Sequence, residues 1–207
     1  MDTRHAQRLL DEIHLQTARC ELFRGYRSQT VAFSGLLGIG AAVAQPWLVP
    51  DPVRHVDAYL KLWIAVAVIS LAVTAAELSY TAWASGSGLV RQKTRRAVAQ
   101  FGPCLLVGGA VTACLTLADL QKTPLLPGLW AICFSLGIFS SRFLLPPAML
   151  AAAIYYALAG CVALCLVEPA AAFSPWTMGT IFGGGQLLTA FVLFLTLERP
   201  RPARRHP

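Results

Sequence analysis

Six long apolar runs dominate this sequence and constrain its fold more than any other feature. We place them at about 29–49, 60–82, 98–118, 125–141, 148–167 and 175–197. Each run has about 17–23 residues, the length that a helix rising about 1.5 Å per residue needs to cross the hydrocarbon layer of a bilayer. Prolines between the runs, such as Pro50 and Pro146, end one helix before the next begins. The sequence therefore predicts an all-α integral membrane bundle of six transmembrane helices.

Composition agrees with lipid as the solvent for most of the chain. Hydrophobic residues occupy 56% of the 207 positions and charged residues only 13%, about half the charged share of soluble domains. A soluble fold could not bury that much apolar surface behind so few charges. The basic residues lie between apolar runs and do not form an aromatic-plus-basic pattern, so nucleic acid is not an expected partner.

The chain divides into three parts. Segment 1–28 is charged and carries an apolar stripe with helical spacing, which predicts a cytoplasmic amphipathic helix that packs on the bundle or lies on anionic lipid. The alternative is that this helix pairs with a partner or with a second copy of the chain. The transmembrane domain covers 29–198, and a basic cytoplasmic tail covers 199–207.

The distribution of charge predicts the orientation. If six spans are assumed, all of the 17 Lys and Arg residues except Arg54, Lys61 and Lys122 fall on one side of the membrane. The positive-inside rule then places both termini in the cytoplasm. The loop after the second run is expected to face anionic lipid at the membrane surface, through Arg91, Lys93, Arg95 and Arg96.

The tryptophans lie near the ends of the runs, which predicts an interfacial belt of Trp47, Trp63, Trp83, Trp130 and Trp176.

Two ionisable residues near the cytoplasmic ends of the runs are candidate functional residues. Glu77 lies in the second run, about one turn from its end, and Arg142 lies at a similar depth at the end of the fourth. An ion pair between them at the inner interface is one interpretation. The alternative is that Glu77 binds a proton or a cation, since ionisable groups within the membrane are often functional.

Uncharged polar residues and glycines within the runs indicate contacts between helices. Gln45 and Gln186 are expected to hydrogen-bond between helices, and a small polar cavity around Gln186 and Tyr155 is the alternative for that pair. Glycines spaced for close helix packing predict a tight bundle or a dimer; they are Gly35, Gly38, Gly40, Gly108, Gly109, Gly179, Gly183, Gly184 and Gly185.

The positions of the histidines argue against several kinds of membrane enzyme. All four lie outside the apolar runs, at His5, His14, His55 and His206. A haem held by two histidines in the bundle, a zinc protease of the HExxH type and a serine triad all require a histidine within the membrane. We therefore expect no cofactor, no metal and no catalytic residue in this chain.

Part of the sequence resembles a group of small bacterial multi-pass inner-membrane proteins. The resemblance covers the stretch Arg8-Leu9-Leu10-Asp11-Glu12-Ile13 and, later in the chain, Leu126-Pro127-Gly128-Leu129-Trp130, Gly137, Arg142, Leu145-Pro146, Tyr155 and Gly160. It implies a bacterial inner membrane as the location, and it implies no activity.

Three functions remain open at this stage. The preferred one is a non-enzymatic membrane protein, such as a sensor, regulator or accessory component that acts through helix contacts. The first alternative is a small, dimeric transporter or channel that uses Glu77 and Gln186. An enzyme acting on lipid or quinone is the least favoured. A homo-oligomer or another membrane protein is the expected protein partner. A continuous polar cavity would favour transport, whereas a dry core would favour the first function.

Overall fold

All regular elements in the part of the chain that the structure describes are helices. The computed structural model describes residues 28–84, 86, 88–166 and 168–198, so the N-terminal helix and basic tail expected from the sequence lie outside them. The long helices are α2 (Ser28–Leu48), α3 (Val56–Ala84), α4 (Gly88–Ala118), α5 (Leu126–Ser140) and α6 (Met149–Cys165). Shorter elements are η1 (Leu120–Leu125), α7 (Pro169–Ala172), α8 (Pro175–Met178), η2 (Gly179–Gly184), α9 (Gly185–Leu193) and η3 (Phe194–Glu198).

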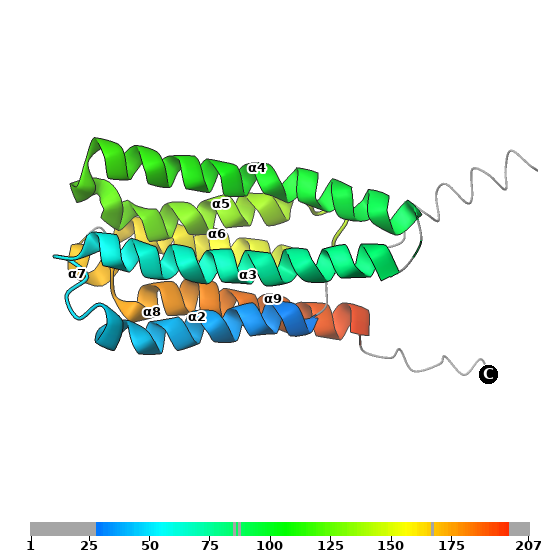
Figure 1. The fold of residues 1–207 in the computed structure, drawn as a ribbon, viewed down its shortest axis with the longest axis horizontal. Helices are drawn as coiled ribbons and strands as arrows, with labels where there is room; N and C mark the ends of the chain where they lie inside the picture. Colours follow the sequence, from blue (N-terminus) through cyan, green and yellow to red (C-terminus); the bar gives the residue numbers. More distant parts are fainter. Residues whose placement is uncertain (1–27, 85, 87, 167, 199–207) are drawn as a thin grey trace, which may run out of the picture.

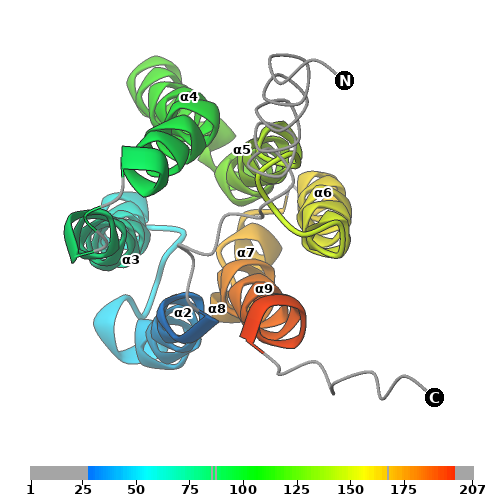
Figure 2. The same ribbon diagram turned by 90° about the vertical axis from the view of Figure 1, so that its right-hand side faces the viewer.

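The helices share one long axis and stand in a ring that follows chain order (Figures 1 and 2). The elements α8, η2, α9 and η3 follow one another directly and form the last column of the ring. Each helix packs on its chain neighbours, and α2 packs on α9, which closes the ring. The chain enters α2 and leaves η3 at the same end of the bundle (Figure 1). We call this the basic end, because Arg91, Arg95, Arg96 and Arg142 lie there.

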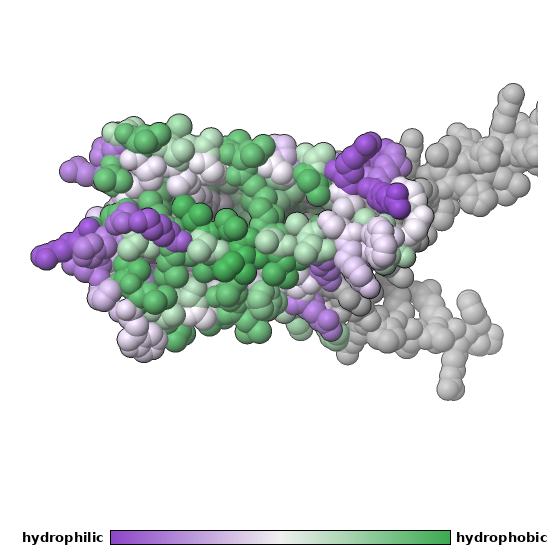
Figure 3. Space-filling model, viewed as in Figure 1, coloured by the Kyte–Doolittle hydropathy of each residue, from purple (hydrophilic) through white to green (hydrophobic). Residues whose placement is uncertain are grey.

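Five helical segments are long and apolar enough to cross a bilayer, as expected for a membrane protein. They are Ser28–Leu48, Val56–Ala84, Thr94–Ala118, Leu120–Ser140 and Pro175–Thr196. Helix α6 is apolar but has only 17 residues. The surface agrees with a membrane setting, because hydrophobic residues cover the middle of the bundle and hydrophilic ones gather at its two ends (Figure 3).

Glycines bring two pairs of helical elements into backbone contact, and the sequence predicted the first of them. Between α2 and η2, a Cβ on Gly35 would lie 3.0 Å from the carbonyl oxygen of Gly183. Between α5 and α6, a Cβ on Gly128 would lie 2.9 Å from the carbonyl oxygen of Gly160. Both distances are shorter than a normal carbon–oxygen contact, so these sites accept only glycine at the present helix spacing. Gly40 and Gly109 make no such contact within the chain, because no heavy atom lies within 4 Å of an added Cβ.

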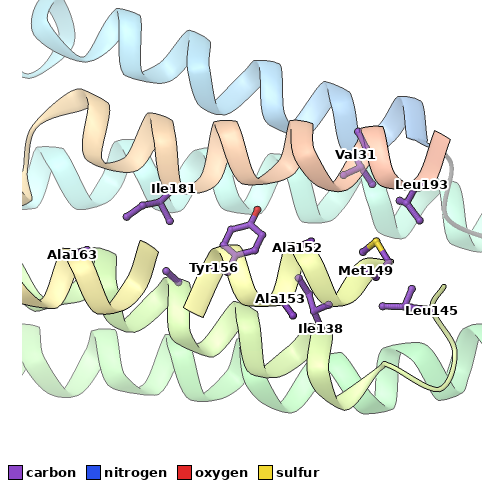
Figure 4. Packing of buried hydrophobic residues seen from close by; sticks show 12 residues of the cluster. Val31, Ile138, Leu145, Met149, Ala152, Ala153, Tyr156, Ala163, Ile181 and Leu193 are labelled. Atoms are coloured by element: carbon purple, nitrogen blue, oxygen red, sulfur yellow. The ribbon is translucent and has the colours of Figure 1, made fainter. Parts of the chain in front are cut away.

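Helix α6 supplies the centre of one core cluster (Figure 4). Tyr156 is fully buried and points from α6 toward α9, where Gly185 leaves space for its ring. A Cβ on Gly185 would lie 2.5 Å from Cζ of Tyr156. Around it pack small and branched apolar residues of α6 itself, such as Ala152 and Ala153, and of the neighbouring elements, such as Ile181. The contact fixes α6 between α5 and the last column of the ring.

Gln45 forms the hydrogen-bonded link between helices that the sequence predicted. Its side chain is 1% exposed; Nε2 donates to the carbonyl oxygen of Phe173 at 2.8 Å, and Oε1 accepts from Trp63 Nε1 at 3.0 Å.

The predicted belt of interfacial tryptophans is only partly right. Trp47, Trp83 and Trp176 are exposed at helix ends, but Trp63 is buried, and Trp130 is half-buried and donates to Thr112 Oγ1 at 2.8 Å. These two indoles satisfy their N–H groups within the protein instead of at the interface.

Candidate functional site

The two helices α3 and α4 pack loosely on the rest of the ring. In the most apolar stretch of each helix, the share that is buried inside the protein is only 11% for α3 and 6% for α4. The same share is 39% for α2 and 50% for the Leu120–Ser140 span. The buried residues of α3 are Tyr59, Leu60, Trp63 and Leu78, so nothing between 64 and 77 is buried. Helix α3 is thus held at its two ends and stands away from the core along its middle.

Hydrophobic clusters make these two attachments. At the end opposite the basic end, Tyr59 and Trp63 pack with Leu126 and Phe173, and the ring centroids of Tyr59 and Phe173 lie 4.7 Å apart. At the basic end, Leu78 of α3 and Ala97 of α4 pack with Leu144 of the α5–α6 loop. The space between the two clusters is left unfilled.

That space is a cavity of about 680 Å³, lined by the long helices, by the α5–α6 loop and by the last column of the ring, with only Met149 contributed by α6. The volume lies in the range of pockets that bind small organic ligands. Four large lining residues of α3 and α4 are also exposed; they are Ile64, Val68, Leu71 and Leu105. The cavity therefore opens sideways between α3 and α4, where the surface is hollowed in Figure 3, and this side faces lipid in a membrane.

The lining is apolar, and no residue of the described chain that lines the cavity is charged. Five hydroxyl side chains of the lining bond to carbonyl oxygens of their own helices at 2.8–3.2 Å; they are Ser34, Thr74, Thr112, Thr116 and Thr189. Such internal bonds leave the hydroxyls with little to offer a polar ligand. The walls thus favour an apolar ligand over an ion or a sugar.

Three polar side chains of the lining have no hydrogen-bond partner in the described part of the protein. They are Ser70 on α3, Gln186 on α9 and Ser141 at the start of the α5–α6 loop, whose hydroxyl is buried. An amide or hydroxyl in apolar surroundings costs free energy when it lacks a partner. These groups are therefore the polar contacts that the cavity can offer to a ligand.

The structure separates the residues that the sequence grouped as a candidate site. Glu77 accepts a hydrogen bond from the Thr30 hydroxyl of α2, and it does not line the cavity. Arg142 lies over the ring of Phe143, with its guanidinium carbon 4.4 Å from the ring centroid. The described residues contain no ion pair between Glu77 and Arg142, so the pair predicted from their similar depth is wrong. Similar depth places two residues at one level of the bilayer, but it does not place them on facing helices.

Gln186 and Tyr155 are also apart. Gln186 lines the cavity, whereas Tyr155 is absent from its lining and donates its hydroxyl to the carbonyl oxygen of Thr180 at 2.6 Å. Thr180 belongs to the π-helical turn η2, where the usual helical hydrogen bonds are interrupted. Tyr155 therefore supports this turn, and the predicted small polar cavity shared by Gln186 and Tyr155 is wrong.

The basic residues predicted as a loop belong to a helix. Positions Arg91, Lys93, Arg95 and Arg96 lie in the first turns of α4, which has 31 residues. A helix of that length is roughly 46 Å long, more than the hydrocarbon layer needs, so its first turns extend beyond it. Arginine, lysine and glutamine are good helix formers, which explains why the helix continues into water. The side chains of Arg91, Arg95 and Arg96 are exposed.

Sequence reasoning missed the cavity, although a signal for it was present. Ser70 and Thr74 lie one turn apart on the second run, and Thr112 and Thr116 lie one turn apart on the third. All four line the cavity. Two neighbouring runs that each carry a short hydroxyl stripe indicate helix faces that look toward each other rather than toward lipid.

Comparisons of this chain with protein-family models, with curated proteins and with solved structures found no match.

Proposed function

We propose that this chain is a non-enzymatic membrane protein that binds an apolar ligand, taken up from the surrounding lipid through the gap between α3 and α4, and that acts as a sensor or accessory component. The observation that carries the proposal is the laterally open cavity of about 680 Å³. A bundle that served only as an anchor would gain dispersion energy by filling this space with side chains. Here α3 is fixed at both ends and kept away from the core in between.

The chemistry of the cavity supports an apolar ligand rather than ion transport. A path for ions needs charged or polar groups that continue through the membrane. The described lining residues include no charged group, and hydrophobic clusters stand at both ends of the cavity. Glu77, on which a transport function would depend, lies outside the lining and is bonded to Thr30.

The proposal includes six membrane crossings, with both termini on the cytoplasmic side of a bacterial inner membrane. Helix α6 lies along the same axis as its neighbours, and α2 begins where η3 ends (Figure 1). The 17 residues of α6 form a helix roughly 25 Å long, and a modest thinning of the bilayer accommodates this length. The exposed side chains of Arg91, Arg95 and Arg96 would then meet anionic lipid. Reporter fusions after 200 and within 120–123 should give cytoplasmic and periplasmic signals respectively, and a periplasmic signal after 200 would contradict this topology.

A binding experiment with a fluorescent hydrocarbon tests the function. Trp63 and Trp130 line the cavity, so their emission should transfer to diphenylhexatriene bound there. We expect saturable energy transfer with one probe per chain in detergent. The double variant Ala67→Phe with Gly109→Phe should abolish it, because both positions line the cavity and neither is buried.

The matched control is Ala65→Phe with Ala110→Phe, which adds the same two rings to the same helices at exposed positions outside the lining. This variant should bind the probe as the parent does. Energy transfer that rises linearly with probe concentration in all three proteins would overturn the proposed function, because it would reflect the micelle rather than a site.

A further inference from the structure

Gln186 occupies an unusual place for an amide. It lies 11 residues after Pro175, where the last column of the ring begins, and 12 before Glu198, where it ends. At about 1.5 Å per residue it is roughly 17 Å from either end, which is the middle of a bilayer. Its side chain lines the cavity and makes no hydrogen bond to the described residues.

Ser70 lies at a similar depth on another wall. It is 14 residues from both ends of α3, near the midpoint of that helix. Its hydroxyl also lacks a partner in the described chain and also lines the cavity. Helices α3 and α9 are not neighbours in the ring, since α2 stands between them (Figure 2). The cavity thus presents two hydrogen-bond donors at mid-membrane from two separate walls.

An acyl chain of a phospholipid cannot use these donors. Its ester oxygens stay at the edge of the hydrocarbon layer, roughly 15 Å from the centre. A ligand that satisfies Gln186 has to bring an oxygen acceptor into the middle of the membrane on an otherwise apolar body. A lipid-soluble quinone does so, because its ring carries two carbonyl oxygens on opposite sides and its tail is hydrocarbon. The neutral lining suits a neutral ring of this kind.

We infer that the ligand of this cavity is a lipid-soluble quinone, whose carbonyl oxygens accept hydrogen bonds from the Gln186 amide and the Ser70 hydroxyl. The inference rests on the proposed function, because it specifies the ligand of the same cavity. The proposed role is binding alone, with no electron transfer by the protein. The amide and the hydroxyl then supply selectivity, and the apolar walls supply most of the affinity.

A competition between two matched ligands tests the inference. Immobilised protein in detergent is equilibrated with equal concentrations of decyl-1,4-benzoquinone and decylbenzene, which both carry a decyl tail on a planar six-carbon ring, whereas only the quinone carries carbonyl oxygens. The bound ligands are extracted and measured by chromatography. Gln186→Leu should reduce the preference of the parent for the quinone about tenfold, the factor expected for one hydrogen bond in an apolar site. Binding of decylbenzene by this variant should stay unchanged and shows that the cavity is intact.

The milder variant Ser70→Ala, on the loosely packed α3, should reduce the preference for the quinone about threefold. If Gln186→Leu does not fold, the effect of Ser70→Ala tests the inference in its place. An unchanged preference in the folded variants would overturn the inference while leaving an apolar binding site in place. If the parent retains neither ligand, the proposed function itself fails, so the two failures are distinguishable.

Discussion

The contact between α2 and η2 gives the sharpest stability prediction, at Gly183. Alanine at this position would place its Cβ 2.7 Å from Cγ1 and 3.1 Å from the backbone nitrogen of Ile39, and 3.3 Å from the carbonyl oxygen of Gly35. Two of these three atoms belong to the backbone, so no side-chain rotation relieves the contact. The substitution Gly183→Ala therefore forces α2 and η2 apart.

The magnitude follows from two opposing effects. Overpacking of a well-packed contact costs about 1–3 kcal/mol, and the backbone contacts put Gly183→Ala near the upper end. The gain in helix propensity from glycine to alanine returns about 1 kcal/mol. We expect a net loss of about 2 kcal/mol in the free energy of unfolding. Gly40→Ala is the matched control on α2, because its Cβ would meet no heavy atom within 4 Å.

Unfolding by titration with sodium dodecyl sulfate, followed by circular dichroism in mild detergent, measures the difference between the two variants. Gly40→Ala should be as stable as the parent or up to about 1 kcal/mol more stable. If Gly183→Ala matches Gly40→Ala in stability, the backbone contact between α2 and η2 is not as close as described, and the reasoning is refuted.

Two further substitutions test hydrogen bonds between helices. Gln45→Leu should lower the free energy of unfolding by about 2–4 kcal/mol, because it leaves the Trp63 indole and the Phe173 carbonyl without partners in an apolar core; a loss below about 0.5 kcal/mol in the same titration would contradict this. Thr30→Val and Glu77→Gln should show a coupling of about 1–2 kcal/mol in a double-mutant cycle, since the Thr30 hydroxyl donates to the Glu77 carboxylate. A cycle that pairs Glu77→Gln with Arg142→Gln should give no coupling, and a coupling of similar size there would restore the predicted ion pair.

Hydropathy predicted the helices well because the lipid requirement acts on every run alone. A span must satisfy its backbone internally and present apolar side chains, whatever its neighbours are. The role of Gln45 and the contact of Gly35 with Gly183 were also within reach, since amides and glycines in apolar runs have few other uses.

Which helix faces meet could not be deduced in the same way. Lipid and protein interior are both apolar, so a run such as α3 carries no strong pattern that marks its buried side. Trp63 therefore looked like an interfacial residue, and Glu77 was assigned to Arg142 instead of Thr30. The cavity escaped detection for the same reason, because it depends on how α3 and α4 stand relative to the core.

The most direct test of the central claim is the content of the purified protein itself. The parent chain, extracted from its membrane in mild detergent and treated with organic solvent, should release an apolar small molecule at about one per chain, measured by mass spectrometry. The control Ala65→Phe with Ala110→Phe should release the same amount, and Ala67→Phe with Gly109→Phe should release none, because its rings occupy the cavity. Equal amounts of the same lipids from all three proteins would contradict a binding site between α3 and α4.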